Sequence, residues 1–443
     1  MAKVQQNILV DDHEWRASPA TLLAQPAVGR KHPGKHPGKH PGEGNLMKRV
    51  AARPENAHQA RMLGMLRDNG PLSRAELGDA GGLSRTKIAI EVGRLVELGL
   101  VEDAGPALSR GGRRSTMARL APDLRFLGID IGATSVDVAL TDGELRVLDH
   151  VSQPCDVRAG PTAVIDAVVS LAAKLRAERG VQDLFGAGVG VPGPVSFRDG
   201  APVVPPLMPG WHHVPIRDLL SQELGCPVVV DNDVNIMAMG ERQAGVARGA
   251  EDFLFIKLGT GIGCGVVLAG RVHRGVSGSA GDIGHIRVHD DGPWCACGNA
   301  GCLEAFFGGA ALARDATAAA KEHRSAILSE RLAAGHELTA VDVGIAAAAG
   351  DVVAIELVRE GGRRLGQVIA GLVSFVNPGL VVIGGGVAGL GHTLLAEVRS
   401  VVYRRSLPLA TENLAIVLSE LGGLAGVVGG ARLASDIVFD EPR

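Results

Sequence analysis

FLGIDIGATSVDVALTDGEL at residues 126–145 aligns without gaps with FLFIKLGTGIGCGVVLAGRV at residues 253–272. In both stretches an apolar strand ends in a glycine loop, and a second apolar strand follows. Phe126 matches Phe253, and Gly132 matches Gly259. A strand–loop–strand unit that occurs twice predicts an α/β fold with two lobes of similar architecture, packed around a cleft.

Three glycine loops follow apolar strands, two in this repeat and one after Leu380-Val-Val-Ile383. Backbone N–H groups in such turns can hold phosphate oxygens without an intervening side chain. Turns that only let strands pack remain the alternative, since a regulator can keep such loops without using nucleotide. The candidate nucleotide-binding residues are Asp130, Gly132, Thr134, Gly259, Thr260, Gly261, Gly384 and Gly385.

The motif Asp-Asn-Asp-Val-Asn at residues 231–235 follows a strand of valines. A carboxylate at a strand end that faces a cleft can accept the proton of a sugar hydroxyl attacking a γ-phosphate. The same carboxylate, with Asn232, could instead hydrogen-bond a sugar. A plain helix N-cap is a third interpretation.

Three of the six cysteines lie within eight residues, too close together for an ordinary disulfide framework. Cys295, Cys297 and Cys302, with His285, supply three thiolates and one imidazole, which complete a closed tetrahedral shell for a structural Zn²⁺. Free buried thiols are the alternative. Asp282, His285 and Glu304 bracket this loop and could present polar groups to a ligand, His285 through its second ring nitrogen.

The segment before the repeat carries the signals of a winged helix-turn-helix. A helix is expected from about Asn56 to Asn69, a second from the capping box Ser73–Glu76, and a third after Ser84. Basic and hydroxyl residues at the start of the third helix suit the major groove, and paired arginines suit a wing tip. A helical protein-interaction module is the alternative. The candidate DNA-binding residues are Ser84, Arg85, Thr86, Lys87, Arg113 and Arg114.

Charge is unevenly distributed along the 443 residues. Residues 47–120 hold 13 Lys and Arg against 8 Asp and Glu, whereas residues 121–443 hold 26 against 36. A basic segment on an acidic body indicates that only the former meets a polyanion. The N-terminal stretch lacks the apolar core of a signal peptide, and the apolar stretch 369–390 is interrupted by Asn377-Pro378, so we expect a cytoplasmic protein.

The chain is expected to divide into three parts. Residues 1–46 contain the repeat KHPGKHPGKHPG at 31–42 and are predicted to be a disordered tail, with Met47 as an alternative translation start. Residues 47–121 are assigned to the winged helix-turn-helix. Residues 122–443 are assigned to the two-lobed domain, with the zinc loop at 285–302.

Together these motifs resemble the ROK family (repressors, open reading frames and sugar kinases), in its DNA-binding regulator branch. The resemblance runs from about Asn56 to Ala434. It is carried by GGRR at 111–114, DIGATS at 130–135, GVPGPV at 190–195, PGW at 209–211, DNDVN at 231–235, GTGIGCG at 259–265, GDIGH at 281–285, CACGNAGCLE at 295–304 and GGG at 384–386.

The resemblance implies an actin-like ATPase/sugar-kinase (ribonuclease H-like) fold. It implies that Asp233 is the catalytic base if kinase activity is retained, and that Mg-ATP is then a cofactor. It also implies sugar binding and a zinc site. The implied sugar-binding residues are Asn232, Asp233, Asp282, His285 and Glu304, and the implied zinc ligands are His285, Cys295, Cys297 and Cys302.

The sequence departs from the kinases of the family at three places. Asp282 stands where they usually carry Glu, DIGATS replaces DIGGTK, and PPLMPGW lacks an Asn often found there. These changes weaken the expectation of phosphoryl transfer more than that of sugar binding. We therefore expect a transcriptional regulator of carbohydrate metabolism, and repression is the commoner mode in the family. The regulator is expected to bind operator DNA as a homodimer or homotetramer and to respond to a sugar or sugar phosphate. An ATP-dependent, glucokinase-like sugar kinase, possessing or lacking a working DNA-binding segment, remains the alternative.

Overall fold

The computed structural model describes residues 52–106 and 116–440. The expected tail and the wing arginines Arg113 and Arg114 lie outside the described residues. Among the helices that are described, none combines the length and apolar character that a membrane crossing requires.

Three helices and a small sheet form the N-terminal part, called here the head (residues 52–106 and 116–121). Their order is α2 (Ala57–Asn69), β1 (Leu72–Ser73), α3 (Arg74–Gly81), α4 (Arg85–Glu97), β2 (Val101–Pro106) and β3 (Thr116–Leu120). The sheet order is β1-β3-β2. Ser73 and Glu76 form the expected capping box, and Ser84 caps α4. The three helices of the head thus lie where the sequence predicted them, together with a small three-stranded sheet.

The two halves of the sequence repeat start two five-stranded sheets with the same connectivity. The first sheet has the order β10-β7-β4-β5-β6 and the second the order β13-β12-β11-β14-β15. In each, the first strand of the repeat pairs antiparallel with its hairpin partner and parallel with a later strand. The prediction of two similar lobes is confirmed. The strands are β4 (Phe126–Ile131), β5 (Ser135–Thr141), β6 (Val147–Pro154), β7 (Gly186–Val191), β10 (Val228–Asn232), β11 (Phe253–Leu258), β12 (Ile262–Leu268), β13 (Arg271–Val272), β14 (Leu380–Gly384) and β15 (Ala415–Leu418).

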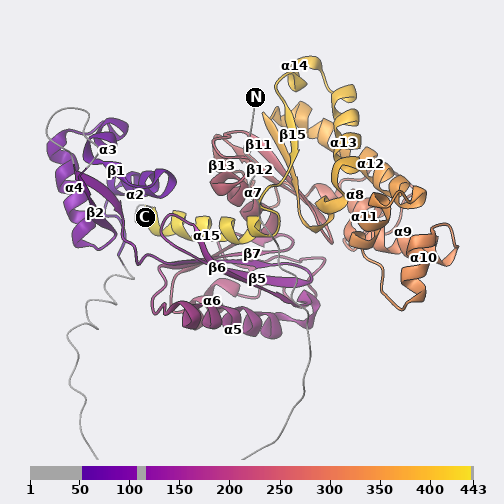
Figure 1. The fold of residues 1–443 in the computed structure, drawn as a ribbon, viewed down its shortest axis with the longest axis horizontal. Helices are drawn as coiled ribbons and strands as arrows, with labels where there is room; N and C mark the ends of the chain where they lie inside the picture. The colour runs from indigo at the N-terminus through magenta and orange to yellow at the C-terminus, as the bar shows by residue number, and fades with distance from the viewer. Residues whose placement is uncertain (1–51, 107–115, 441–443) are drawn as a thin grey trace, which may run out of the picture. The chain divides into compact units, whose positions relative to one another are not determined.

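Helices cover both faces of the first sheet. One face carries α5 (Pro161–Arg179) and α6 (Ile216–Leu224), and the other carries α7 (Asp233–Ala244) and the last helix, α15 (Leu424–Phe439) (Figure 1). In the second lobe, the long helix α12 (Val352–Val376) packs against α13 (Gly391–Arg405). The shorter elements are β8 (Val195–Ser196), β9 (Ala201–Pro202), α8 (Leu303–Phe307), α9 (Gly309–Lys321), α10 (Ala326–Ala333), α11 (Ala340–Ala348) and α14 (Pro408–Thr411).

The helix α15 packs unusually closely on its neighbours because glycines face them. A Cβ on Gly429 would lie 1.6 Å from the carbonyl oxygen of Ile236 in α7, and one on Gly426 would lie 2.0 Å from Oδ2 of Asp130 in β4. Neither position can carry a side chain without displacing backbone or a buried carboxylate. The start of α15 is therefore fixed against the loop end of β4.

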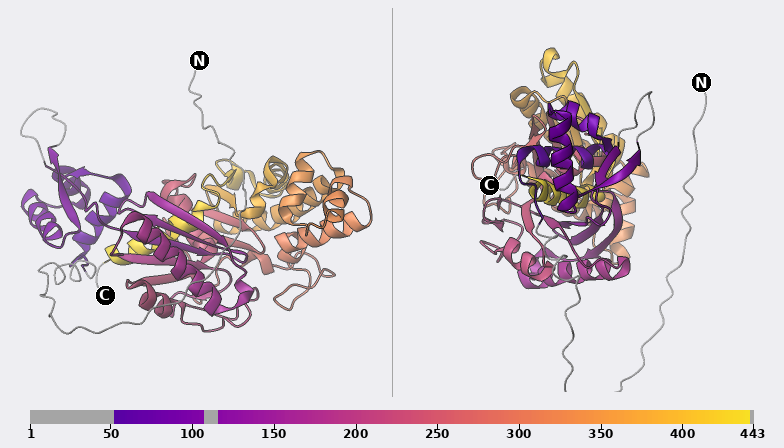
Figure 2. Two further views of the ribbon diagram at one scale, coloured as in Figure 1. Left: turned by 60° about the horizontal axis from the view of Figure 1, so that its bottom comes forward. Right: turned by 90° about the vertical axis from the view of Figure 1, so that its left-hand side faces the viewer.

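The other end of α15 contacts the head (Figures 1 and 2). Arg67 of α2, whose side chain is only 4% exposed, pairs with Asp436 at 2.7 Å and bonds Ser435 at 3.1 Å. Arg432 pairs with Asp68 at 3.1 Å. One helix thus joins the inner end of β4 to the first helix of the head.

Candidate functional site

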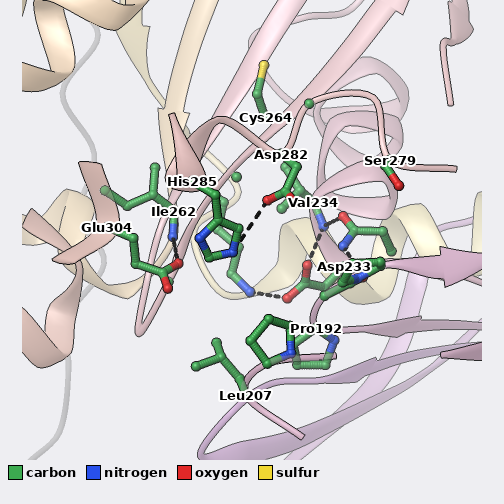
Figure 3. A pocket seen from close by; sticks show the side chains of 18 of the residues that line it. Pro192, Leu207, Asp233, Val234, Ile262, Cys264, Ser279, Asp282, His285 and Glu304 are labelled. Carbon is green, nitrogen blue, oxygen red and sulfur yellow. Dashed lines mark hydrogen bonds and ion pairs between the residues drawn. The ribbon is translucent and has the colours of Figure 1, made fainter. Parts of the chain in front are cut away.

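A pocket of about 840 Å³, including its open mouth, lies where residues of both lobes meet. The first lobe contributes Pro192, Asn232 and Asp233, and the second contributes the loop after β11, the segment 278–282, His285 and Glu304. Figure 3 shows Asp233 on one side of this pocket and Asp282, His285 and Glu304 on the other. The structure therefore brings together all five residues expected to bind sugar.

Asn232 and Asp233 lie at the junction of β10 and α7. The Asn232 side chain accepts a hydrogen bond from the Val234 N–H at 2.9 Å, and its amide donates to the Gly193 carbonyl at 2.8 Å. Asn232 is thus the N-cap of α7, as one of the interpretations expected, and it also lines the pocket. Asp233 is buried, 3% exposed, and its Oδ1 accepts from the Val234 N–H at 2.8 Å.

Lys257, near the end of β11, pairs with Oδ2 of Asp233 inside this pocket. This residue was not expected from the sequence. Burial by itself would lower the pKa of Lys257, but Asp233 and Asp130 outweigh it and the pKa is raised. The sequence feature that could have revealed Lys257 is its charge inside the otherwise apolar strand FLFIKL, close to a glycine loop.

The opposite wall presents two further carboxylates. Oε2 of Glu304 accepts a hydrogen bond from the Ile262 N–H at 3.0 Å, and Oδ1 of Asp282 lies 3.7 Å from Nε2 of His285. Burial raises the pKa of Glu304. A ligand rich in hydroxyl groups would find acceptors on both sides of the pocket.

The four expected metal ligands converge. The ligand atoms of His285, Cys295, Cys297 and Cys302 all lie within 4.8 Å of one another. Nδ1 of His285 faces Sγ of Cys295 at 3.4 Å, which leaves Nε2 toward Asp282. Three thiols and one imidazole at these separations fit a tetrahedral zinc ion, whose role would be to fix this loop. The two ring nitrogens of His285 thus face different sides, Nδ1 the cysteines and Nε2 Asp282.

The glycine loops are only partly in the pocket. Thr260 and Gly261 line it, whereas Asp130, Gly132, Thr134, Gly259, Gly384 and Gly385 do not. The second and third loops are neighbours, because Lys257 of β11 pairs in register with Gly384 of β14. Asp130 is 7% exposed, and its Oδ1 has no hydrogen-bond partner within residues 52–106 and 116–440.

An ion pair not expected from the sequence bridges the lobes beside the pocket. Arg274, after β13, bonds Oδ2 of Asp231 in β10 at 2.7 Å, and its guanidinium lies 4.0 Å from the ring centre of Phe197. Asp231 is 2% exposed and also accepts from the Asn235 amide at 2.9 Å. The pair ties the loop that carries residues 278–281 of the pocket to the first lobe.

The four candidate DNA-binding residues that the structure describes lie together and exposed at the start of α4: Ser84, Arg85, Thr86 and Lys87. Two of them also serve the fold. Oγ of Ser84 accepts from the Lys87 N–H at 3.3 Å, and Nζ of Lys87 pairs with Glu91 at 3.0 Å. Hydrogen bonds from Asn56, Gln59 and Lys87 outweigh the effect of burial and lower the pKa of Glu91 to about 2.

The curated relatives of this chain include glucokinases and xylose repressors. A glucokinase of Halalkalibacterium halodurans is 35% identical over 314 residues, which are 70% of this chain and 95% of that enzyme. A xylose repressor of Caldicellulosiruptor bescii is 27% identical over 368 residues, which are 82% of this chain and 91% of the repressor. The repressor match therefore takes in more of this chain than the glucokinase match.

Solved structures show the same division. A ROK family transcriptional regulator, a homologue of the Escherichia coli MLC protein, covers 89% of this chain and 96% of its own with a TM-score of 0.73 and 24% identity, so it shares the fold. A ROK glucokinase from Streptomyces griseus, in complex with glucose and AMPPNP, covers 70% of this chain and 99% of its own with a TM-score of 0.63 and 33% identity. Residues 126–437 match the ROK family. The chain belongs to the ROK family.

Proposed function

We propose that this protein is a transcriptional regulator of carbohydrate metabolism whose head binds operator DNA and whose cleft binds a sugar. The observation that carries the proposal is the combination, in one chain, of a head with winged helix-turn-helix order and the two-lobed fold of the family. The likeness to a ROK regulator over 89% of the chain supports it. Repression, zinc in the Cys₃His cluster and a homo-oligomer that places two heads on one operator belong to the same proposal.

The structure offers a physical route from cleft to head. The helix α7 begins at Asp233 in the cleft and packs along α15, which in turn contacts α2. From Gly426, against Asp130, to Asp436, against Arg67, α15 spans about 15 Å at the usual helical rise. If the sugar binds one arrangement of the two lobes more tightly than another, its binding favours that arrangement. Helices α7 and α15 would then move with the lobes and carry the head with them.

DNA binding is tested by fluorescence anisotropy with the promoter DNA of the protein's own gene and a random duplex of equal length. Arg85→Ala removes an exposed cation at the start of α4, and we expect a loss of about 1–3 kcal/mol in specific binding. Arg94→Ala is the matched control, because Arg94 lies at the other end of α4 and pairs with Glu55 at 3.3 Å. Equal affinity of wild type for promoter and random DNA would contradict the proposal.

Sugar binding is tested by a thermal-shift screen that includes D-xylose and D-glucose. A ligand present at 100 times its Kd adds about 2.7 kcal/mol to the stability of the folded state. Asp282→Asn, which keeps the shape of the side chain but removes an anionic acceptor from the pocket wall, should reduce the shift. A screen without any shift would refute the sugar-binding part alone.

A sugar kinase is the second candidate, and the 35% identity to a glucokinase over 95% of that enzyme favours it. Asp233 would then act as the base that accepts the sugar hydroxyl proton. Sugar-dependent turnover of Mg-ATP that Asp233→Asn abolishes would establish this function.

A further inference from the structure

The buried lysine of the cleft comes from the second lobe and is attracted by two acidic groups of the first lobe. Lys257 comes from β11 of the second lobe, and its ammonium pairs with Asp233 of α7. Its side chain is 17% exposed and that of Asp233 is 4% exposed, so this charge pair lies largely out of water. Such a pair is retained only where further charges or hydrogen bonds compensate its desolvation.

Asp130 of β4 is the second acidic neighbour of this lysine. Burial raises the pKa of Asp130 to about 7, against the attraction of Lys257 and with the repulsion of Asp233 and Asp137. Conversely, Asp130 and Asp233 both raise the pKa of Lys257. The ammonium of the second lobe therefore pairs with Asp233 and also attracts Asp130, both of the first lobe.

Two buried carboxylates that repel each other, as Asp130 and Asp233 do, can be neutralised by a divalent cation or by a cation of the protein. Carboxylate oxygens are the ligands that Mg²⁺ and Mn²⁺ prefer. Oδ1 of Asp130, buried and without a partner in the described residues, is the kind of atom such an ion would bind. Here, however, the ammonium already holds Oδ2 of Asp233, and it would repel a second cation.

We propose that the Lys257 ammonium takes the place of a divalent cation between Asp130 and Asp233, so that the cleft receives a sugar without a metal–nucleotide partner. The neighbouring loop after β4 adds no positive charge at residue 135. That residue is an uncharged serine, whose Oγ donates a hydrogen bond to Asp137 at 3.0 Å. Mg-ATP, which the kinase candidate requires, therefore does not fit these residues as they stand, and this proposal argues against that candidate. The cleft keeps acceptors for a neutral polyhydroxy ligand in Asp282 and Glu304.

The test measures Mn²⁺ binding to the zinc-loaded full chain by electron paramagnetic resonance. Lys257→Met removes the charge and keeps the length of the side chain, so we expect Mn²⁺ affinity to rise by about tenfold or more over wild type. Adding Asp130→Asn to Lys257→Met should remove the gain. Lys321→Met, at the exposed end of α9, is the matched control and should leave Mn²⁺ binding at the wild-type level.

Equal Mn²⁺ affinity in wild type and Lys257→Met, whether strong or absent in both, would overturn the proposal. A gain that persists with Asp130→Asn would place the ion elsewhere and would overturn it as well. If Lys257→Met does not fold, judged by circular dichroism and gel filtration, Lys257→Gln gives the same comparison with a polar side chain. Because the measurement involves neither DNA nor sugar, its outcome is independent of the proposed regulatory function.

Discussion

Replacing Arg67 by methionine is expected to loosen the head from α15. The Arg67 side chain is 4% exposed and bonds three acceptors, Asp68 at 2.8 Å, Asp436 at 2.7 Å and Ser435 at 3.1 Å. Breaking a fully buried ion pair costs about 3–5 kcal/mol. The two carboxylates here are 41% and 39% exposed, and Arg432 continues to pair with both, so the ion-pair contribution is smaller.

The buried Ser435 hydroxyl, 0% exposed, loses its partner and adds about 1 kcal/mol. We therefore expect a local destabilisation of about 2 kcal/mol, which corresponds to about a 30-fold change in an opening equilibrium. Hydrogen exchange of the α2 amides, followed by mass spectrometry, measures this opening directly. Those amides should exchange about 30-fold faster in Arg67→Met than in wild type.

Arg94→Met is the control for this prediction, because Arg94 lies in the same head but is 52% exposed and pairs with the equally exposed Glu55. It should change exchange in α2 by less than about twofold, as exposed pairs contribute little. Exchange in Arg67→Met that stays within this limit would refute the idea that this junction holds the head. If the junction also transmits the sugar signal, Arg67→Met should still bind promoter DNA but respond less to sugar.

Three further predictions concern the body of the protein. Because burial raises the pKa of Asp130 to about 7 from 3.8, the folded chain holds a proton that the unfolded chain releases, so the contribution of Asp130 to the free energy of unfolding falls as pH rises from about 4 to about 7. Asp130→Asn should remove this part of the slope in melting temperatures measured from pH 4 to 8, and parallel curves for the two proteins would contradict it. Plasma mass spectrometry of the purified protein should find about one zinc per chain. Cys297→Ser removes one of the four ligands, so it should lower the zinc content and make the melting temperature insensitive to a chelator. Gly429→Ala places a Cβ 1.6 Å from the Ile236 carbonyl oxygen and should cost at least about 1–3 kcal/mol, whereas Gly371→Ala, whose Cβ meets nothing within 4 Å, should be neutral or stabilising in the same melts.

Local signals in the sequence predicted several of the individual elements. The helix expected from about Asn56 to Asn69 is α2, the helix expected after Ser84 is α4, and the capping box Ser73–Glu76 begins α3 as expected. Each of these rests on neighbouring residues, such as a cap, a glycine stop or an apolar run. The repeat at 126–145 and 253–272 extended this to two lobes, because similar sequences fold into similar units.

The sequence by itself determined the family, the two-lobed architecture, the four residues of the Cys₃His cluster and the five candidate sugar-binding residues that line the cleft. Only the tertiary structure decided that Lys257 pairs with Asp233, that Arg274 reaches Asp231 across the lobes, and that α15 links Asp130 to Arg67. These partners lie 24, 43 and several hundred residues apart, and their pairing depends on how the sheets and helices pack rather than on any local pattern. A charged residue inside an apolar strand indicates that its charge must be paired once it is buried. Which residue pairs with it depends on how the sheets and helices pack.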